Sequence, residues 1–308
     1  MDEATPTTGS IDAPVWFGPL GSPTWLVPTP GTGAARVMFA AERWDGDAGV
    51  NEAGRDLRMG LPLFLAESAR YLTRVVPEVV AQPIGPEPPA GDEGRLVLSG
   101  VAPEGRASVR VRILDRASGE TLEAVERTAA DERELGDVLS TLPSDLTSRL
   151  RSVGVSAMWD PRFAPPPPPL SVALVRGQHA CLQLSRPATH EANRDADREA
   201  LRRERIGSML RPLAGAATRS NDIFPAVLFF GALLGAVSGG APVLQEYRLP
   251  ANARCMEATD DRDPIFRLSA LVLRVIGDAG VAQQRVRRLS SVPDPDLQRW
   301  LAALETIR

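Results

Sequence analysis

The sequence predicts a two-part protein. An N-terminal α+β or α/β domain, with a mixed sheet and two main helices, precedes an all-α C-terminal domain that resembles a helical repeat. Three observations carry this prediction. Short apolar runs of strand length recur between residues 37 and 128, apolar residues recur with helical spacing after residue 200, and five consecutive prolines stand between the two halves. A chain of 308 residues is also long enough for two domains.

The first half alternates strand-like and helix-like segments. Residues 37–41 form an apolar run of strand length, and 51–74 carry apolar residues at helical spacing around Pro62, which kinks or starts this helix. A second helix is expected at 132–153, bent or split by Pro143. Further strands are expected at 75–84, 96–98, 109–113 and 122–128. Turn residues between the last two strands indicate a hairpin.

Composition divides the chain into four parts. An extended Pro/Gly-rich arm occupies 1–34, the α/β domain 35–156, a Pro-rich linker 157–169 and the helical domain 170–308. The proline run is typical of a stiff polyproline II spacer, because it lacks backbone donors. In the last part, helical stripes are expected at 206–213, 223–244, 265–276, 281–289 and 297–304.

One segment carries the features of a known family. An apolar strand ends in Ser-Gly at 96–100, a strand at 109–114 alternates with arginines, and an Asp-x-x-Ser-Gly-Glu hairpin at 115–122 leads into an acidic helix start. This order resembles the TolB-like amino-terminal α/β domain of bacterial proteins, over roughly 36–150. The loop at 85–94 departs from the family pattern, which has a short helix there, so no binding role is carried over to it.

Tetratricopeptide repeats often follow that domain, and the helical half resembles degenerate repeats of this kind. Small residues at fixed positions let two helices approach closely. One unit matches at Val227, Phe230, Gly231, Leu234, Val243 and Tyr247. A looser unit matches at Phe266, Ala270, Leu273, Ala282, Val286 and Leu289, with an inserted loop between the two. The resemblance implies a helical array that binds other proteins.

The reactive side chains exclude several kinds of chemistry. The chain has no lysine, so Schiff bases and phosphate-loop lysines are ruled out. Its histidines, His179 and His190, and its cysteines, Cys181 and Cys255, lack the spacing of a metal site or a catalytic triad. The glycine pair at 31–33 precedes a strand, whereas a dinucleotide fingerprint follows one. We therefore expect no catalytic residue, no metal and no cofactor.

Charge and the N-terminus bear on partners and location. The net charge of −4 and an aromatic content of 5% argue against nucleic acid as a partner. Residues 1–9 are acidic and lack the basic and apolar regions of a secretory signal, and two cysteines do not make a disulfide framework. We expect a cytoplasmic protein.

The uncharged stretch 223–244 leaves an alternative open. Its length suits a bilayer, and the glycines 231, 235 and 239 follow a packing pattern seen in membranes. Pro225 and Pro242 and the lack of flanking basic clusters favour a buried central helix instead.

These observations predict a non-catalytic adaptor or assembly subunit of a larger bacterial complex, with other proteins as its partners. The expected contact residues are Trp16, Phe17 and Trp25 on the arm, and Arg285, Arg287 and Arg288 on a basic helix. The alternatives are a membrane-anchored envelope protein that uses 223–244 and, third, an enzyme of unknown type.

Overall fold

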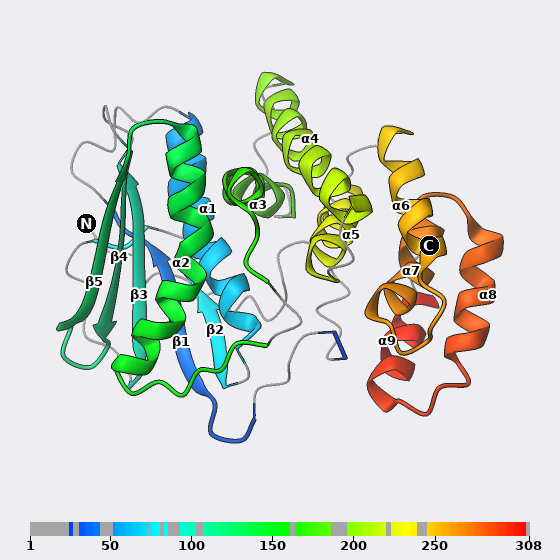
Figure 1. Ribbon diagram of the computed structural model, residues 1–308, viewed down its shortest axis with the longest axis horizontal. Helices are drawn as coiled ribbons and strands as arrows, with labels where there is room; N and C mark the ends of the chain where they lie inside the picture. The colour runs from blue at the N-terminus through cyan, green and yellow to red at the C-terminus, as the bar shows by residue number, and fades with distance from the viewer. Residues whose placement is uncertain are drawn as a thin grey trace. The chain divides into compact units, whose positions relative to one another are not determined.

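The protein is described here from a computed structural model, shown in Figure 1. The described residues are 25–26, 31–43, 52–72, 74–80, 83–85, 93–102, 107–160, 164–185, 196–219, 223–238 and 245–305. The chain divides into two compact units. Unit 1 comprises Met1–Asp12, Pro30–Asp160 and Pro165–His179, and unit 2 comprises Ala13–Thr29, Pro161–Ala164 and Ala180–Arg308.

Unit 1 is built on a mixed five-stranded sheet of order β2-β1-β3-β4-β5. The strands are β1 (Ala35–Ala41), β2 (Val75–Val79), β3 (Arg95–Ala102), β4 (Ala107–Asp115) and β5 (Thr121–Ala129). Strand β1 pairs in parallel with β2 and β3, whereas β3, β4 and β5 are antiparallel. The predicted hairpin between β4 and β5 is confirmed. Asp115 Oδ1 accepts the N–H groups of Ala117 and Ser118 in its turn.

Two helices, α1 (Glu52–Arg70) and α2 (Glu132–Ser152), lie beside each other over the sheet, α1 against β1–β3 and α2 mainly against β5 (Figure 1). Pro62 and Pro143 lie inside these helices, and neither proline starts or splits its helix. Asp131 caps α2 by accepting the N–H of Glu134 at 2.8 Å. A separate apolar cluster contains only strand and loop residues, namely Met38, Ala40, Val80, Leu96, Leu98, Leu114 and Ile84.

The third helix, α3 (Pro168–Ser185), corrects the predicted domain boundary. The proline run does not form a spacer ahead of a separate domain at 170. It leads into α3, and residues 165–179 belong to unit 1. Proline suits a first helical turn, where its missing N–H has no partner to lose. The side chain of Ser171 donates to the carbonyl of Pro166 at 3.1 Å, and its N–H donates to that of Pro167 at 3.0 Å.

Glycines on α1 and α2 let α3 lie directly against both helices. A Cβ built on Gly60 would stand 1.7 Å from the carbonyl oxygen of Val175 on α3. A Cβ on Gly136 of α2 would stand 2.7 Å from the carbonyl oxygen of Pro168. Helix α3 is therefore a packed part of unit 1, at a distance that any larger residue at position 60 would prevent.

Unit 2 consists of helices joined by turns and loops, with no strand among its described residues. Its helices are α4 (Ala196–Arg219), α5 (Ile223–Ser238), α6 (Gln245–Glu257), α7 (Pro264–Val275), α8 (Ala279–Leu289) and α9 (Pro295–Glu305). Helix α4 packs on α5 and α6, and α7 packs on α5, α6 and α8. The predicted fold class, an α+β part followed by a helical part, is confirmed.

Aspartates mark the starts of the last three helices of this unit. Asp263 caps α7 and Asp278 caps α8. The residues Asp294-Pro295 are a helix start signal in the sequence, and the structure confirms it, because Asp294 accepts the N–H groups of Asp296 and Leu297 at 3.1 Å at the start of α9.

The uncharged stretch 223–244 contains the 16-residue helix α5, which ends at Ser238. From Ala226 to Leu234 the side chains of α5 are buried on all sides, apart from Gly231, which has none. Phe229 packs against Phe230 and against Tyr247 of α6. Within the described residues, no helix combines the length and the apolar character that a bilayer crossing requires. Helix α5 is thus the central buried helix of unit 2.

Candidate protein-binding groove

An apolar opening in unit 2 lies between α4 and α6. It has a volume of about 520 Å³. Its α4 wall consists of Arg211, Ala214, Gly215 and Thr218, and its α6 wall of Glu246, Tyr247, Leu249, Pro250 and Ala253. Small residues on both walls leave room for a side chain from outside. The volume falls within the range of about 300–1,000 Å³ that is typical of ligand sites.

Helix α6 continues this apolar surface away from the groove. Leu249 is 78% exposed and Met256 48% exposed, and Ala253 between them is also exposed. The spacing of four and three residues places these side chains on one helix face. Most large apolar side chains in the described residues are buried. A stripe of apolar residues facing solvent beside a groove is typical of a contact surface.

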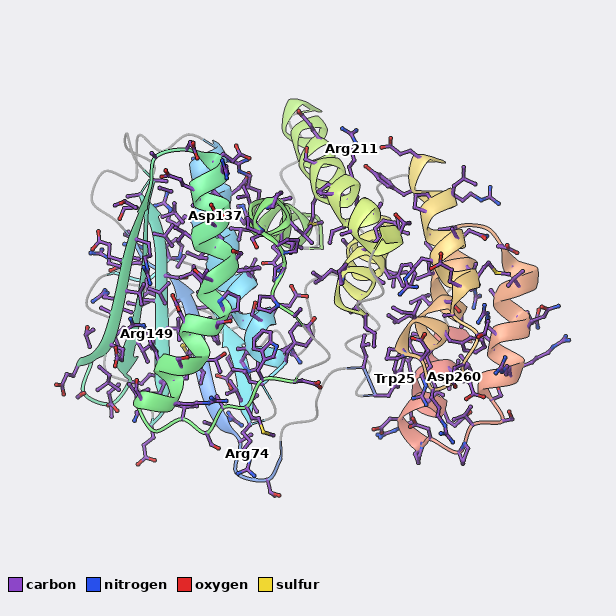
Figure 2. All side chains as sticks on the ribbon, in the orientation of Figure 1. Trp25, Arg74, Asp137, Arg149, Arg211 and Asp260 are labelled. Atoms are coloured by element: carbon purple, nitrogen blue, oxygen red, sulfur yellow. The ribbon has the colours of Figure 1, made fainter. Side chains whose placement is uncertain are left out.

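Polar groups gather at one edge of the groove. The hydroxyl of Tyr247 donates to the carbonyl of Gly207 on α4 at 3.1 Å. Burial, together with the nearby Glu246 carboxylate, raises the pKa of Tyr247 to about 12, although Arg211 opposes the shift. The phenol therefore stays neutral at physiological pH and holds α4 to α6. Arg211 and Glu246 are both exposed, one on each wall, and Figure 2 labels Arg211 on α4.

The structure corrects the prediction that Arg285 is a surface contact. This side chain is only 8% exposed. Its guanidinium donates to the carbonyls of Ala258 at 2.6 Å and Cys255 at 3.0 Å, at the end of α6. It also lies 3.9 Å above the centre of the Phe266 ring. Because free carbonyls end every helix, Arg285 serves to complete α6 and is not available to a partner.

The other two arginines of the predicted basic helix are exposed. Arg288 lies 4.8 Å from the centre of the Phe266 ring and 3.7 Å from the Asp261 carboxylate, so it has partners within unit 2. Arg287 points to solvent on α8. The predicted patch of three arginines is thus reduced to Arg287 and Arg288 as exposed charges, with Arg288 already paired.

Of the arm residues predicted as contacts, Trp16 and Phe17 lie outside the described residues. Trp25 packs within the chain: its ring meets Trp300 of α9 edge to face, with centroids 5.3 Å apart. The guanidinium of Arg267 lies 5.5 Å from the centre of the Trp25 ring. The neighbouring Leu26 is fully buried. Trp25 therefore packs on α9 within unit 2 and is only partly exposed.

A second polar cluster joins α1 to α3 in unit 1. His179 Nδ1 lies 2.8 Å from Asp56 Oδ1, and Gln178 Nε2 donates to Glu67 Oε2 at 2.5 Å. All four side chains are buried. The predicted boundary at residue 170 placed His179 in the helical domain, whereas α3 carries it into unit 1. Within the described residues, no group of three or more potential ligands is arranged to hold a metal ion.

The arginines that alternate along β4 have a structural role. Arg110 Nε donates to Glu42 Oε2 at 3.0 Å, and Arg112 Nη2 donates to Glu42 Oε1 at 2.5 Å. Glu42 follows β1 and is fully buried. A buried carboxylate requires such partners, since leaving it without one costs several kcal/mol. The cluster fixes β4 to the end of β1.

Comparison with known proteins adds no assignment. No family model matches the chain, and a search of curated proteins finds no relative. The TolB-like and tetratricopeptide-like resemblances therefore stay predictions. The candidate site rests on the geometry of α4 and α6.

Proposed function

We propose that the protein is a non-catalytic adaptor or assembly subunit of a larger bacterial complex, and that it holds a partner protein in the groove between α4 and α6. The observation that carries the proposal is Leu249, which is 78% exposed on the wall of an apolar groove. A large apolar side chain in that position favours contact with a partner over contact with water.

The energetics suit a modest, reversible contact. Burying a leucine or methionine side chain is worth about 1.5–3 kcal/mol. Leu249 and Met256 together would thus supply only part of a binding free energy of about 8 kcal/mol, which corresponds to micromolar affinity. A partner helix or strand that lies along the α6 stripe adds further contacts, as in other helix-and-groove complexes.

The proposal includes a cytoplasmic location and a second contact through unit 1. Unit 1 has its own sheet, helices and core, so each unit has the means to bind separately. An adaptor of this kind joins two proteins without chemistry of its own.

The proposal is tested by placing a photo-crosslinking amino acid at Leu249 in the native cells. A crosslinked partner is expected from position 249 but not from Arg287, an exposed residue on α8. In a second variant the crosslinking amino acid stands at position 253. Adding Leu249→Asp to this variant should abolish its crosslink to the partner, because a charge replaces the apolar contact. If the variants with the crosslinking amino acid at 249 and at 253 are both recovered without a crosslinked partner, the proposal is refuted.

A further inference from the structure

The sheet of unit 1 has two edges of different character. At one edge, β2 has five residues and contains Pro77, and a short edge strand with proline resists further pairing. At the other edge, β5 has nine residues and neither proline nor glycine. Among the described residues no strand pairs with the outer side of β5, which forms the rim of the sheet in Figure 1. Such an edge is a template for another strand.

The face of β5 that points away from α2 is open to solvent. Its residues Ala124, Glu126 and Thr128 are all exposed. The other face is held within the chain, because Glu123 accepts a hydrogen bond from Arg149 of α2 at 2.6 Å and Arg127 lies 3.5 Å from the Asp145 carboxylate of the same helix. What β5 offers to a partner is therefore the main chain of its outer edge, and no unpaired charge on the α2 side is needed to attract one.

We propose that this edge binds a second copy of the chain, with the two β5 strands paired antiparallel about a two-fold axis at Val125. The strand Thr121–Ala129 is centred on this residue, so the register uses its full length. Glu123 then lies opposite Arg127 of the second copy, and Ala124 lies opposite Glu126. The pairing uses both β5 edges, so the assembly closes at two chains. This contact does not involve the groove between α4 and α6.

The neighbouring registers are less favourable. Directly opposed residues of an antiparallel pair project to the same face of the sheet, so odd-numbered residues must stay opposite odd-numbered ones. A pair centred on Glu126 would be shorter and would set this carboxylate against its own copy, which is repulsive. A pair centred on Ala124 would also be shorter and would no longer oppose Glu123 to Arg127. Because these two side chains already have partners on α2, their opposition fixes the register, whereas the main-chain hydrogen bonds supply the affinity.

Sedimentation velocity of the full chain over a dilution series measures the pairing. A species of twice the mass of one chain should form as the concentration rises. Ala124→Glu should weaken this dimer about tenfold, because the new carboxylate opposes Glu126 of the other copy twice in each dimer. Adding Glu126→Arg to this variant should restore the dimer, since each opposed pair then carries opposite charges. Gln284→Glu, which adds the same charge at an exposed position of α8, should leave the dimer unchanged.

A chain that sediments as a monomer at every concentration overturns the β5 dimer. A dimer that Ala124→Glu leaves intact, or that Leu249→Asp abolishes, also overturns it, because the contact then lies on another surface. If Ala124→Glu weakens the dimer and Glu126→Arg does not restore it, the register centred on Val125 is wrong. Ala124 and Glu126 are exposed, so these substitutions are compatible with the fold, and circular dichroism of each variant checks this directly.

Discussion

Replacing Gly60 by alanine should destabilise unit 1, although helix propensity alone predicts the opposite. Alanine favours a helix interior over glycine by about 1 kcal/mol. The new Cβ, however, would lie 1.7 Å from the carbonyl oxygen of Val175. This neighbour is main chain, so no rotamer change can remove the clash. Helix α3 must move away from α1 by more than about 1 Å to restore an ordinary contact.

The size of the expected loss of stability follows from the contacts that α3 makes. Displacing packed backbone costs about 1–3 kcal/mol. The same movement lengthens two hydrogen bonds to buried carboxylates, His179 to Asp56 and Gln178 to Glu67. A hydrogen bond to a charged group contributes about 1.5–3 kcal/mol. Even after the gain in helix propensity, we expect a net loss of about 3 kcal/mol.

The assay is urea unfolding followed by far-UV circular dichroism, with Gly207→Ala as the matched control. Gly207 also lies inside a helix, α4, but a Cβ there meets no atom within 4 Å. This control should therefore gain up to about 1 kcal/mol. Equal stability changes in the two variants, or a gain in Gly60→Ala, would show that α3 does not pack against α1 as described.

Three further predictions concern unit 2. Arg285→Ala should lower the unfolding free energy by about 2 kcal/mol, because it leaves two carbonyls at the end of α6 without donors. The control Arg287→Ala should change the unfolding free energy by less than about 0.5 kcal/mol. Urea unfolding compares the two variants. Burial raises the pKa of the Cys255 thiol to about 12, so iodoacetamide at about pH 8 should modify this thiol only after unfolding. Peptide mass spectrometry reads the modification. Rapid modification of Cys255 in the native chain would contradict the prediction. Burial alone would raise the pKa of Asp294, but hydrogen bonds from the N–H of Leu297 and from Arg267 lower it overall. Its stabilising contribution is therefore complete above about pH 4 and is lost as pH falls through the depressed value, so Asp294→Asn should flatten the acid side of the stability curve.

Much of the fold was predictable because local patterns agree with it. Alternation along 109–113 identified β4, the turn residues between 113 and 122 indicated the hairpin to β5, and the Asp-Pro signal located the start of α9. The domain boundary was not predictable in the same way. A proline run is compatible with a spacer and with a first helical turn, and the choice depends on Gly60 and Gly136, far away in sequence, which allow α3 to pack.

The candidate site was harder to predict from the sequence than the fold. Arginines such as Arg285 and Arg287 are alike in sequence, yet one is buried and completes α6 while the other is exposed. Their difference arises from tertiary packing against Phe266 and the carbonyl of Cys255. Trp25 was likewise predicted as a partner contact, because its contact with Trp300 of α9 is a tertiary feature that the local sequence does not show.

The role of helix α6 in the candidate binding surface was not predicted, and the distribution of its apolar residues explains why. Its buried face carries Tyr247, Ala251 and Cys255, and its exposed face carries Leu249, Ala253 and Met256. Because apolar residues occupy both faces, the helix lacks the single apolar stripe that marks a helix in sequence. A helix that packs only on its own unit needs one such face. The second stripe, with Leu249, Ala253 and Met256, faces solvent and adds nothing to the core of unit 2. This exposed apolar stripe is the reason to propose a partner.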